Sequence, residues 1–191
     1  CERNDIDREK IKLHLVDKDE VNAFALPDYH MVVYTGLIED CENEAELCGI
    51  IAHELAHLEK GHIMQKLVKE VGLAVLISMT SGNGNPEIIK QAVKVLTSSA
   101  YDRKLETEAD LTGAEYLINA GIDPEAFAAF MFRMSEQEKG LPDQLYWVST
   151  HPGSEERTQA ILDYIEDREV KVEMILDSTQ WMTLKENISK N

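Results

Sequence analysis

Apolar and polar positions near the N-terminus follow the two-residue period of β-strands. Residues 11–16, IKLHLV, largely alternate and predict a half-buried strand. A second extended segment, 21–26, ends at Pro27, and a third, 30–35, is rich in β-branched and aromatic residues and closes at Gly36. Three short strands in succession predict an antiparallel meander.

From Asn43 onward the apolar spacing changes to that of helices. Asn43 is a suitable N-cap, and the apolar face that follows runs to about Lys60, with Gly61 as a stop. Further helices are predicted at 62–79, 87–98, 102–120, 124–137 and 155–167, with a turn-rich break at 81–86, a loop at 140–154 and a strand at 171–176. The predicted fold is α+β, mainly helical with a small sheet near the N-terminus.

The size and composition of the chain favour one domain. With 191 residues, 43% of them apolar, the chain is long enough to bury a single core. We therefore predict one domain over residues 1–191, with a core at about 10–167 and a C-terminal tail, 168–191, without an assigned role.

The charge balance excludes some partners. Nineteen basic residues face 36 acidic ones, so the net charge of −17 argues against nucleic acid and against an anionic membrane surface. The longest apolar run, 71–79, is about half the length of a bilayer-spanning helix, so we predict no transmembrane segment in this chain and expect it to be soluble.

Cysteine usage and the N-terminal residues leave the compartment open. Cys1, Cys41 and Cys48 are too few and too scattered for a disulfide framework and form no CxxC pair. No secretory signal is expected, because the chain is charged from its second residue. Cys1 is either the acylated first residue of a lipoprotein or simply the point at which the sequence begins, and we favour the second.

The candidate chemistry lies at residues 51–61, IAHELAHLEKG. His53 and His57 are four residues apart, on one face of the predicted helix, so both imidazoles can reach one ion. Neutral imidazoles bind Zn²⁺ firmly, and a water in an open coordination position is acidified to a pKa of roughly 7. Glu54 lies beside the metal and can accept the proton of that water. The strongly apolar character of the predicted helix supports this interpretation, because two histidines and a glutamate are costly to bury without partners.

A third protein ligand must come from elsewhere in the chain. Residues 53–57 fit the pattern HExxH, which metzincins extend to HExxHxxGxxH. Here Lys60 stands in place of the glycine and Ile63 in place of the last histidine. A downstream acidic residue is the best candidate, and Glu106 and Asp110 share one helical face. One can bind the metal while the other orients a ligand, although spacing alone does not choose between Glu106, Glu108 and Asp110.

Several sequence blocks carry a resemblance to a known family. They occur in the family's order and cover about residues 10–167: NAFALP (22–27), YTGL (34–37), HELAH (53–57), the R..E..AD pattern (103–110), GAEYL (113–117), AGIDP (120–124) and THPGSEER (150–157). The chain resembles the gluzincin zinc metalloendopeptidases that include HtpX-like, BepA-like and CAAX prenyl protease enzymes. The missing transmembrane helices favour the soluble BepA-like branch.

The resemblance implies a zincin-type domain and assigns roles to several residues. Glu106 becomes the third ligand of one Zn²⁺ ion, beside the two histidines, and Asp110 orients a ligand histidine. His151 stabilises the oxyanion or approaches the zinc itself. Arg157 makes a structural ion pair near Asp110 or Glu106.

The resemblance also places a substrate-binding strand beside the cleft. In this family the NAFALP strand pairs with an extended substrate through its main chain, which makes Asn22, Ala23 and Phe24 the binding candidates. The chain departs from relatives at Asp28 and Tyr29, where they have glycines, so the turn beside the cleft is expected to differ. The N-terminal helix before the first strand is also missing or shortened.

Two functional interpretations follow. The first is a zinc endopeptidase that acts on unfolded or misassembled polypeptides, in quality control of a bacterial periplasm or cell envelope. The second is a latent binding or chaperone module in which His151 caps the metal. Three protein ligands plus water indicate the first, and four protein ligands the second.

The remaining histidines are interpreted as surface or structural residues. His14, His30 and His62 lie outside the motifs, and the interpretation is least secure for His62 because it follows the site closely. The oligomeric state stays open.

Overall fold

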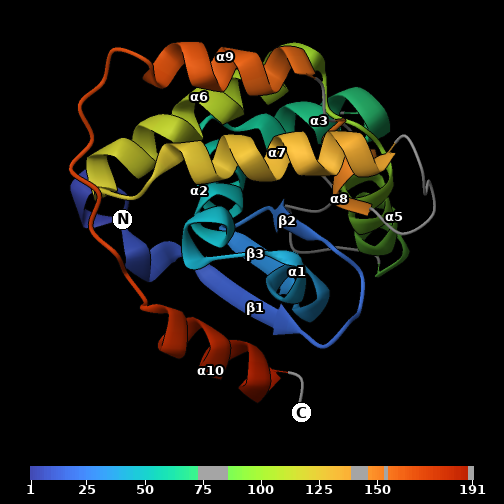
Figure 1. Ribbon diagram of the computed structural model, residues 1–191. Helices are drawn as coiled ribbons and strands as arrows, with labels where there is room; N and C mark the ends of the chain where they lie inside the picture. Colours follow the sequence, from blue (N-terminus) through green and yellow to red (C-terminus); the bar gives the residue numbers. More distant parts are fainter. Residues whose placement is uncertain (73–85, 139–145, 153–154, 189–191) are drawn as a thin grey trace.

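The computed structural model describes residues 1–72, 86–138, 146–152 and 155–188, and Figure 1 shows the arrangement of its elements. The chain is mainly helical with a small sheet near the N-terminus, which confirms the predicted fold class. Two short 3-10 turns, Glu2–Asn4 and Arg8–Lys10, precede the strands β1 (Lys12–Val16), β2 (Ala23–Leu26) and β3 (His30–Tyr34). The helices are α1 (Thr35–Asp40), α2 (Glu44–Glu59), α3 (His62–Val71), α5 (Pro86–Ser98), α6 (Arg103–Ala120), α7 (Pro124–Glu138), α8 (Tyr146–Thr150), α9 (Glu155–Ile165) and α10 (Ser178–Ile188).

The three strands form a mixed sheet, not the predicted antiparallel meander. Their order is β1-β3-β2, with β1 parallel and β2 antiparallel to β3. The connection after β1 is tied to the start of α1, since Gly36 N donates to Lys18 O (2.9 Å) and Lys18 N donates to Thr35 Oγ1 (2.9 Å). These two contacts fix the connection between β1 and β2 at the end of β3. Strand β2 then pairs with β3 on the edge opposite β1.

The first strand is also more exposed than its alternation predicts. All five residues of β1 are exposed, including Leu13 at 59% and Leu15 at 56%. Alternation predicts which side chains share a face of a strand, whereas burial depends on which element covers that face.

Helix α2 begins and ends where the sequence predicts. Asn43 Oδ1 accepts a hydrogen bond from Glu46 N (3.0 Å), and Glu46 Oε2 accepts one from Glu42 N (2.8 Å). Two backbone donors at the helix start are thereby satisfied. Gly61 follows the helix with a φ of 68°, a left-handed conformation that glycine adopts without strain.

Elsewhere the predicted boundaries hold within a few residues, with three exceptions. Helix α3 ends at Val71, and residues 73–79 of that prediction and 81–85 of the turn-rich break lie outside the described residues. The short helix α8 lies inside the predicted loop 140–154. Residues 171–176 form no strand; Glu173 N donates to Gly121 O (2.7 Å), at the end of α6.

Helix α2 occupies the centre of the fold. Figure 1 shows the sheet on one side of α2, with α6, α7 and α9 on the other. Gly113 of α6 makes the closest approach, since a Cβ there would lie 3.1 Å from His53 N. This small residue brings the two helices that carry the candidate site into close contact.

The C-terminal helix α10 packs on α1. In Figure 1 it lies on the side of the sheet that faces away from α6, α7 and α9. Trp181 is buried there, and Lys185 Nζ donates to Cys41 O (2.5 Å) and Glu39 O (2.8 Å). The second half of the predicted tail is therefore folded. Among the helices that the structure describes, none combines the length and apolar character needed to cross a bilayer.

Candidate metal centre

Four metal-binding side chains converge beside α2. The donor atoms of His53, His57, Glu106 and His151 all lie within 4.8 Å of one another, and all four side chains are buried. The histidine pair comes from one face of α2, and Glu106 comes from the first turn of α6. The tertiary structure thus places Glu106 among these donors, whereas Glu108 is half exposed and contacts Lys60 at 3.5 Å.

The donor spacing fits one tetrahedral ion. Zinc–nitrogen and zinc–oxygen bonds of about 2.0–2.1 Å place neighbouring ligand atoms about 3.3 Å apart. His57 Nε2 lies 3.0 Å from His53 Nε2 and 3.3 Å from Glu106 Oε1, while His53 Nε2 lies 3.8 Å from Glu106 Oε2. Three imidazoles with one carboxylate are also donors that a divalent transition metal accepts.

His151 reaches this cluster from the C-terminal part of the chain. Its Nδ1 lies 3.1 Å from His53 Nε2 and 3.0 Å from Glu106 Oε1, and its Nε2 lies 3.2 Å from Glu54 Oε1. The ring stacks on Trp147 of α8, at a centroid distance of 5.0 Å. His151 therefore sits between the candidate ligands and Glu54.

Asp110 and Arg157 form a second layer behind the donors. Asp110 Oδ1 lies 2.9 Å from His53 Nδ1, in a contact bent away from the ideal hydrogen-bond direction. Arg157 Nε and Nη2 donate to Asp110 Oδ2 (2.6 Å) and Oδ1 (2.7 Å), and its Nη1 lies 2.7 Å from Glu106 Oε2. Although burial by itself raises the pKa of both carboxyls, Arg157 and the histidines hold each pKa below its usual value.

Glu54 lies inside the fold, one turn from His57. Its Oε2 accepts a hydrogen bond from Ala25 N (3.0 Å), and its Oε1 accepts one from Trp147 Nε1 (3.3 Å). Burial raises the pKa of this carboxyl to about 8 in the metal-free protein, outweighing the two hydrogen bonds. A bound cation shifts such a pKa downward, toward the ionised form that accepts protons.

The buried histidines are in the form that binds metals. Burial lowers the pKa of His57 to about 3 and that of His151 to about 4, although Glu106 acts in the opposite direction on both. Both rings are therefore neutral near pH 7, and their lone pairs are available to a cation without loss of a proton.

His62, which the sequence analysis interpreted as a surface or structural residue, is a buried neighbour of the site. It opens α3, is buried, and places its Nδ1 3.0 Å from His57 Nδ1. Its Nε2 lies 3.4 Å from Glu108 Oε2. The signal available in the sequence was the helix stop at Gly61, because a reversal there turns the next residue back toward the end of α2.

The predicted substrate-binding residues lie inside the fold. Asn22, Ala23 and Phe24 are all buried, and the Phe24 ring packs edge-on against Tyr34 at 5.7 Å. Strand β2 is an edge strand of the sheet, and the N–H of Ala25 on its outer side donates to Glu54. The strand therefore flanks the cluster, but its side chains are engaged in the core.

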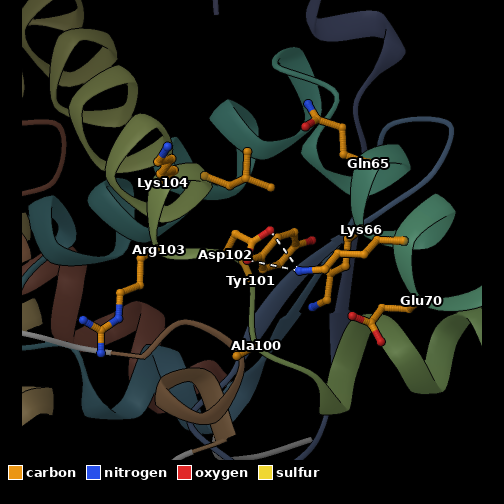
Figure 2. Close-up of a pocket in the computed structure, with 10 residues that line it drawn as sticks. Gln65, Lys66, Glu70, Ala100, Tyr101, Asp102, Arg103 and Lys104 are labelled. Carbon is orange, nitrogen blue, oxygen red and sulfur yellow. Dashed lines mark hydrogen bonds and ion pairs between the residues drawn. The ribbon is translucent and has the colours of Figure 1, made fainter.

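Cavities approach the cluster on the side of Tyr101, whose ring packs on His57 at a centroid distance of 4.2 Å. Figure 2 shows the larger cavity, about 640 Å³, where Lys66 lies over the Tyr101 ring. Asp102, at its edge, accepts hydrogen bonds from Lys69 Nζ (3.0 and 3.1 Å). A smaller cavity of about 120 Å³ is lined by residues that include Tyr101, Glu106 and Arg157.

Comparison with known proteins identifies the family of the chain. Residues 2–165 match the profile of Peptidase family M48. The chain therefore belongs to peptidase family M48, which confirms the family resemblance and leaves the tail from 166 outside the match.

Three relatives illustrate the range of the family. The chain is 30% identical over 166 residues to the Mitochondrial metalloendopeptidase OMA1 of Schizosaccharomyces pombe, covering 86% of this chain and 49% of the relative. It is 28% identical to Metalloprotease LoiP of Escherichia coli (84% and 65%) and 25% identical to the Beta-barrel assembly-enhancing protease of the same organism (75% and 32%). This chain thus spans from about a third to two thirds of the length of these relatives.

Proposed function

We propose that this chain is the catalytic domain of a zinc-dependent metalloendopeptidase. The observation that carries the proposal is the convergence of His53, His57 and Glu106 on one point, with Glu54 on the same helix beside them. Relatives named metalloendopeptidases over most of this chain support it. Asp110 and Arg157 would fix the orientation of His53 and Glu106.

Each residue has a defined task in the proposed reaction. When bound, zinc would supply a Lewis acid for the scissile carbonyl and acidify water. Glu54 would accept the proton of the attacking water at a carboxylate oxygen and return it to the leaving amine. The N–H groups of Ala25 and Trp147 hold this carboxylate in place, so it requires little reorganisation.

The test is turnover of casein, an unfolded polypeptide, by the zinc-loaded chain. Glu54→Gln keeps the size of the side chain but removes the base, so it should lower turnover by about 10²–10⁴-fold while the zinc content stays unchanged. A sample treated with chelator should lose activity and regain it on zinc addition. Full activity in Glu54→Gln, or in the metal-free chain, would contradict the proposal.

A latent form is the second candidate, and the position of His151 favours it. Its Nδ1 lies as close to His53 and Glu106 as a fourth ligand of a tetrahedral ion would. A fourth protein ligand would exclude the water that hydrolysis needs. In this form the chain would bind zinc and polypeptide without cleaving it.

Replacing His151 distinguishes its two proposed roles. As an oxyanion stabiliser, His151 is needed, and His151→Ala should lower casein turnover by about 10²–10³-fold. As a cap on the metal, it is inhibitory, and His151→Ala should raise turnover. Zinc content measured on the same samples separates either effect from loss of the ion.

The proposed substrates are unfolded or misassembled polypeptides. The main chain of β2 would pair with an extended peptide near Asn22, Ala23 and Phe24, since their side chains are engaged in the core. We propose quality control in a bacterial periplasm or cell envelope, and the name of the Beta-barrel assembly-enhancing protease supports this setting, whereas other relatives are named mitochondrial. Cleavage of folded and unfolded forms of one protein, and fractionation of cells that express it, test these two points.

A further inference from the structure

The two candidate ligand histidines of α2, His53 and His57, have different neighbours at their Nδ1 atoms. His53 contacts a carboxylate directly, through Nδ1 and Asp110 Oδ1 at 2.9 Å. His57 instead contacts another imidazole, through Nδ1 and His62 Nδ1 at 3.0 Å. Metal-binding histidines generally donate their remote N–H to an acceptor, which fixes the tautomer and the ring orientation.

With His57 Nε2 bound to the metal, as proposed, the geometry around His57 leaves one consistent proton arrangement. His57 Nε2 faces the other candidate ligands, so its Nδ1 carries the proton and donates it. His62 Nδ1 must then act as the acceptor, and His62 carries its own proton on Nε2. The Nε2 of His62 lies 3.4 Å from Glu108 Oε2, which can accept a hydrogen bond from it.

The surroundings hold both rings in place. The rings of His57 and His62 lie 5.0 Å apart at 73°, and Tyr101 packs on His57 at 4.2 Å. The side chain of His62 is 1% exposed, whereas Glu108 is 49% exposed and lies 3.5 Å from Lys60. A chain of contacts therefore runs from a surface carboxylate through a buried imidazole to His57.

We propose that His62 is a positioning residue for the metal centre, which fixes the tautomer and orientation of His57 and is itself held by Glu108. The inference rests on the proposed function, because it assumes that His57 binds the metal through Nε2. His62 lies outside both the HExxH motif (HELAH, 53–57) and the R..E..AD pattern (103–110).

The experiment measures zinc affinity, by competition with a chromophoric chelator, and the visible spectrum of the Co²⁺-loaded chain. His62→Leu removes the acceptor and should weaken zinc binding about 10–100-fold. His62→Asn is the rescue variant, because Asn Oδ1 stands where His Nδ1 was, and it should recover most of this loss. Glu108→Gln should cause a smaller loss, and His14→Leu, an exposed histidine on β1, should cause none.

The outcomes separate this inference from the function on which it rests. Circular dichroism and melting of the chelated variants show that each one folds. Unchanged zinc affinity and an unchanged Co²⁺ spectrum in folded His62→Leu would overturn the inference alone, as would an equal loss in His62→Leu and His62→Asn. A wild-type chain that binds no zinc would overturn the proposed function together with the inference, whereas the expected order of affinities supports both.

Discussion

Arg157 and Asp110 form a buried two-point ion pair, with Nε 2.6 Å from Oδ2 and Nη2 2.7 Å from Oδ1. The pair joins α9 to α6, and the third nitrogen of the guanidinium faces Glu106 Oε2 at 2.7 Å. One cation therefore compensates two buried carboxylates, the candidate metal ligand Glu106 and Asp110, which lies behind His53.

Loss of this cation should destabilise the fold strongly. Arg157→Gln leaves two buried carboxylates without their counter-charge, which should cost about 3–5 kcal/mol in the free energy of unfolding, measured by urea denaturation. Arg168→Gln is the matched control, since Arg168 pairs with Glu115 near the surface and should cost about 0–1 kcal/mol. Equal losses in the two variants would contradict the buried pair.

The close approach of α6 to α2 should make Gly113 intolerant of a side chain. In an open helix, replacing glycine by alanine stabilises by roughly 0.5–1 kcal/mol. At Gly113 the added Cβ meets the backbone of His53 at 3.1 Å, so Gly113→Ala should destabilise by about 1–3 kcal/mol and weaken zinc binding. Thermal melting checks the sign, and a gain in stability would show that the helices separate at little cost.

The metal-free chain should lose stability on acidification because of its buried histidines. His57 and His151 have pKa values of about 3 and about 4 when folded, below the usual 6.5 of the unfolded chain. Between pH 6.5 and about 4 the unfolded state takes up protons that the folded state does not, so their contribution is present above pH 6.5 and falls with pH. Melting temperatures of the chelated protein, measured across this pH range, test the loss of stability. A pH dependence of the melting temperature that is unaltered by His151→Asn would contradict the assignment to His151.

Glu54 should act in the opposite direction over a higher range. Its folded pKa of about 8 lies above its usual value of 4.5, so its contribution to stability is complete below pH 4.5 and is lost as pH rises through 8. Chelated Glu54→Gln, which cannot ionise, should therefore gain stability relative to the wild type between pH 5 and 8. Parallel melting curves of the two proteins across this range would rule out a buried, protonated Glu54.

The cap of the active helix should contribute about 1 kcal/mol. Asn43→Ala removes the acceptor for Glu46 N and should destabilise by roughly 0.5–2 kcal/mol, whereas Asn43→Asp keeps an acceptor and should change little. Urea denaturation of the two variants checks the difference. An identical effect of Ala and Asp would show that the cap contributes nothing measurable.

The helical part of the site follows from the sequence because it depends on local geometry. His53, Glu54 and His57 belong to one helix, and the four-residue spacing places both imidazoles on one face wherever that helix packs. The start of α2 is likewise local, because Asn43 satisfies an amide three residues away. Short-range patterns therefore predicted α2 and most of the other helix boundaries.

The sheet and the rest of the site depend on contacts between residues far apart in the sequence. Alternation cannot specify that β1 pairs parallel with β3, because that pairing depends on where the connection between β1 and β2 passes. Spacing alone left Glu106, Glu108 and Asp110 open. In the structure Glu108 stays half exposed, while Glu106 faces His57 Nε2 and Asp110 lies against His53 Nδ1.

The sequence by itself determined a helix with two histidines on one face, a glutamate beside them and, through the family blocks, a set of candidate partners. Only the tertiary structure decided how those partners meet, bringing His151 from 98 residues away to within 3.1 Å of His53 and turning His62 back onto His57. The physical reason is that helix geometry is set by bonds between near neighbours, whereas the centre forms only where α2, α3, α6 and α8 pack against one another.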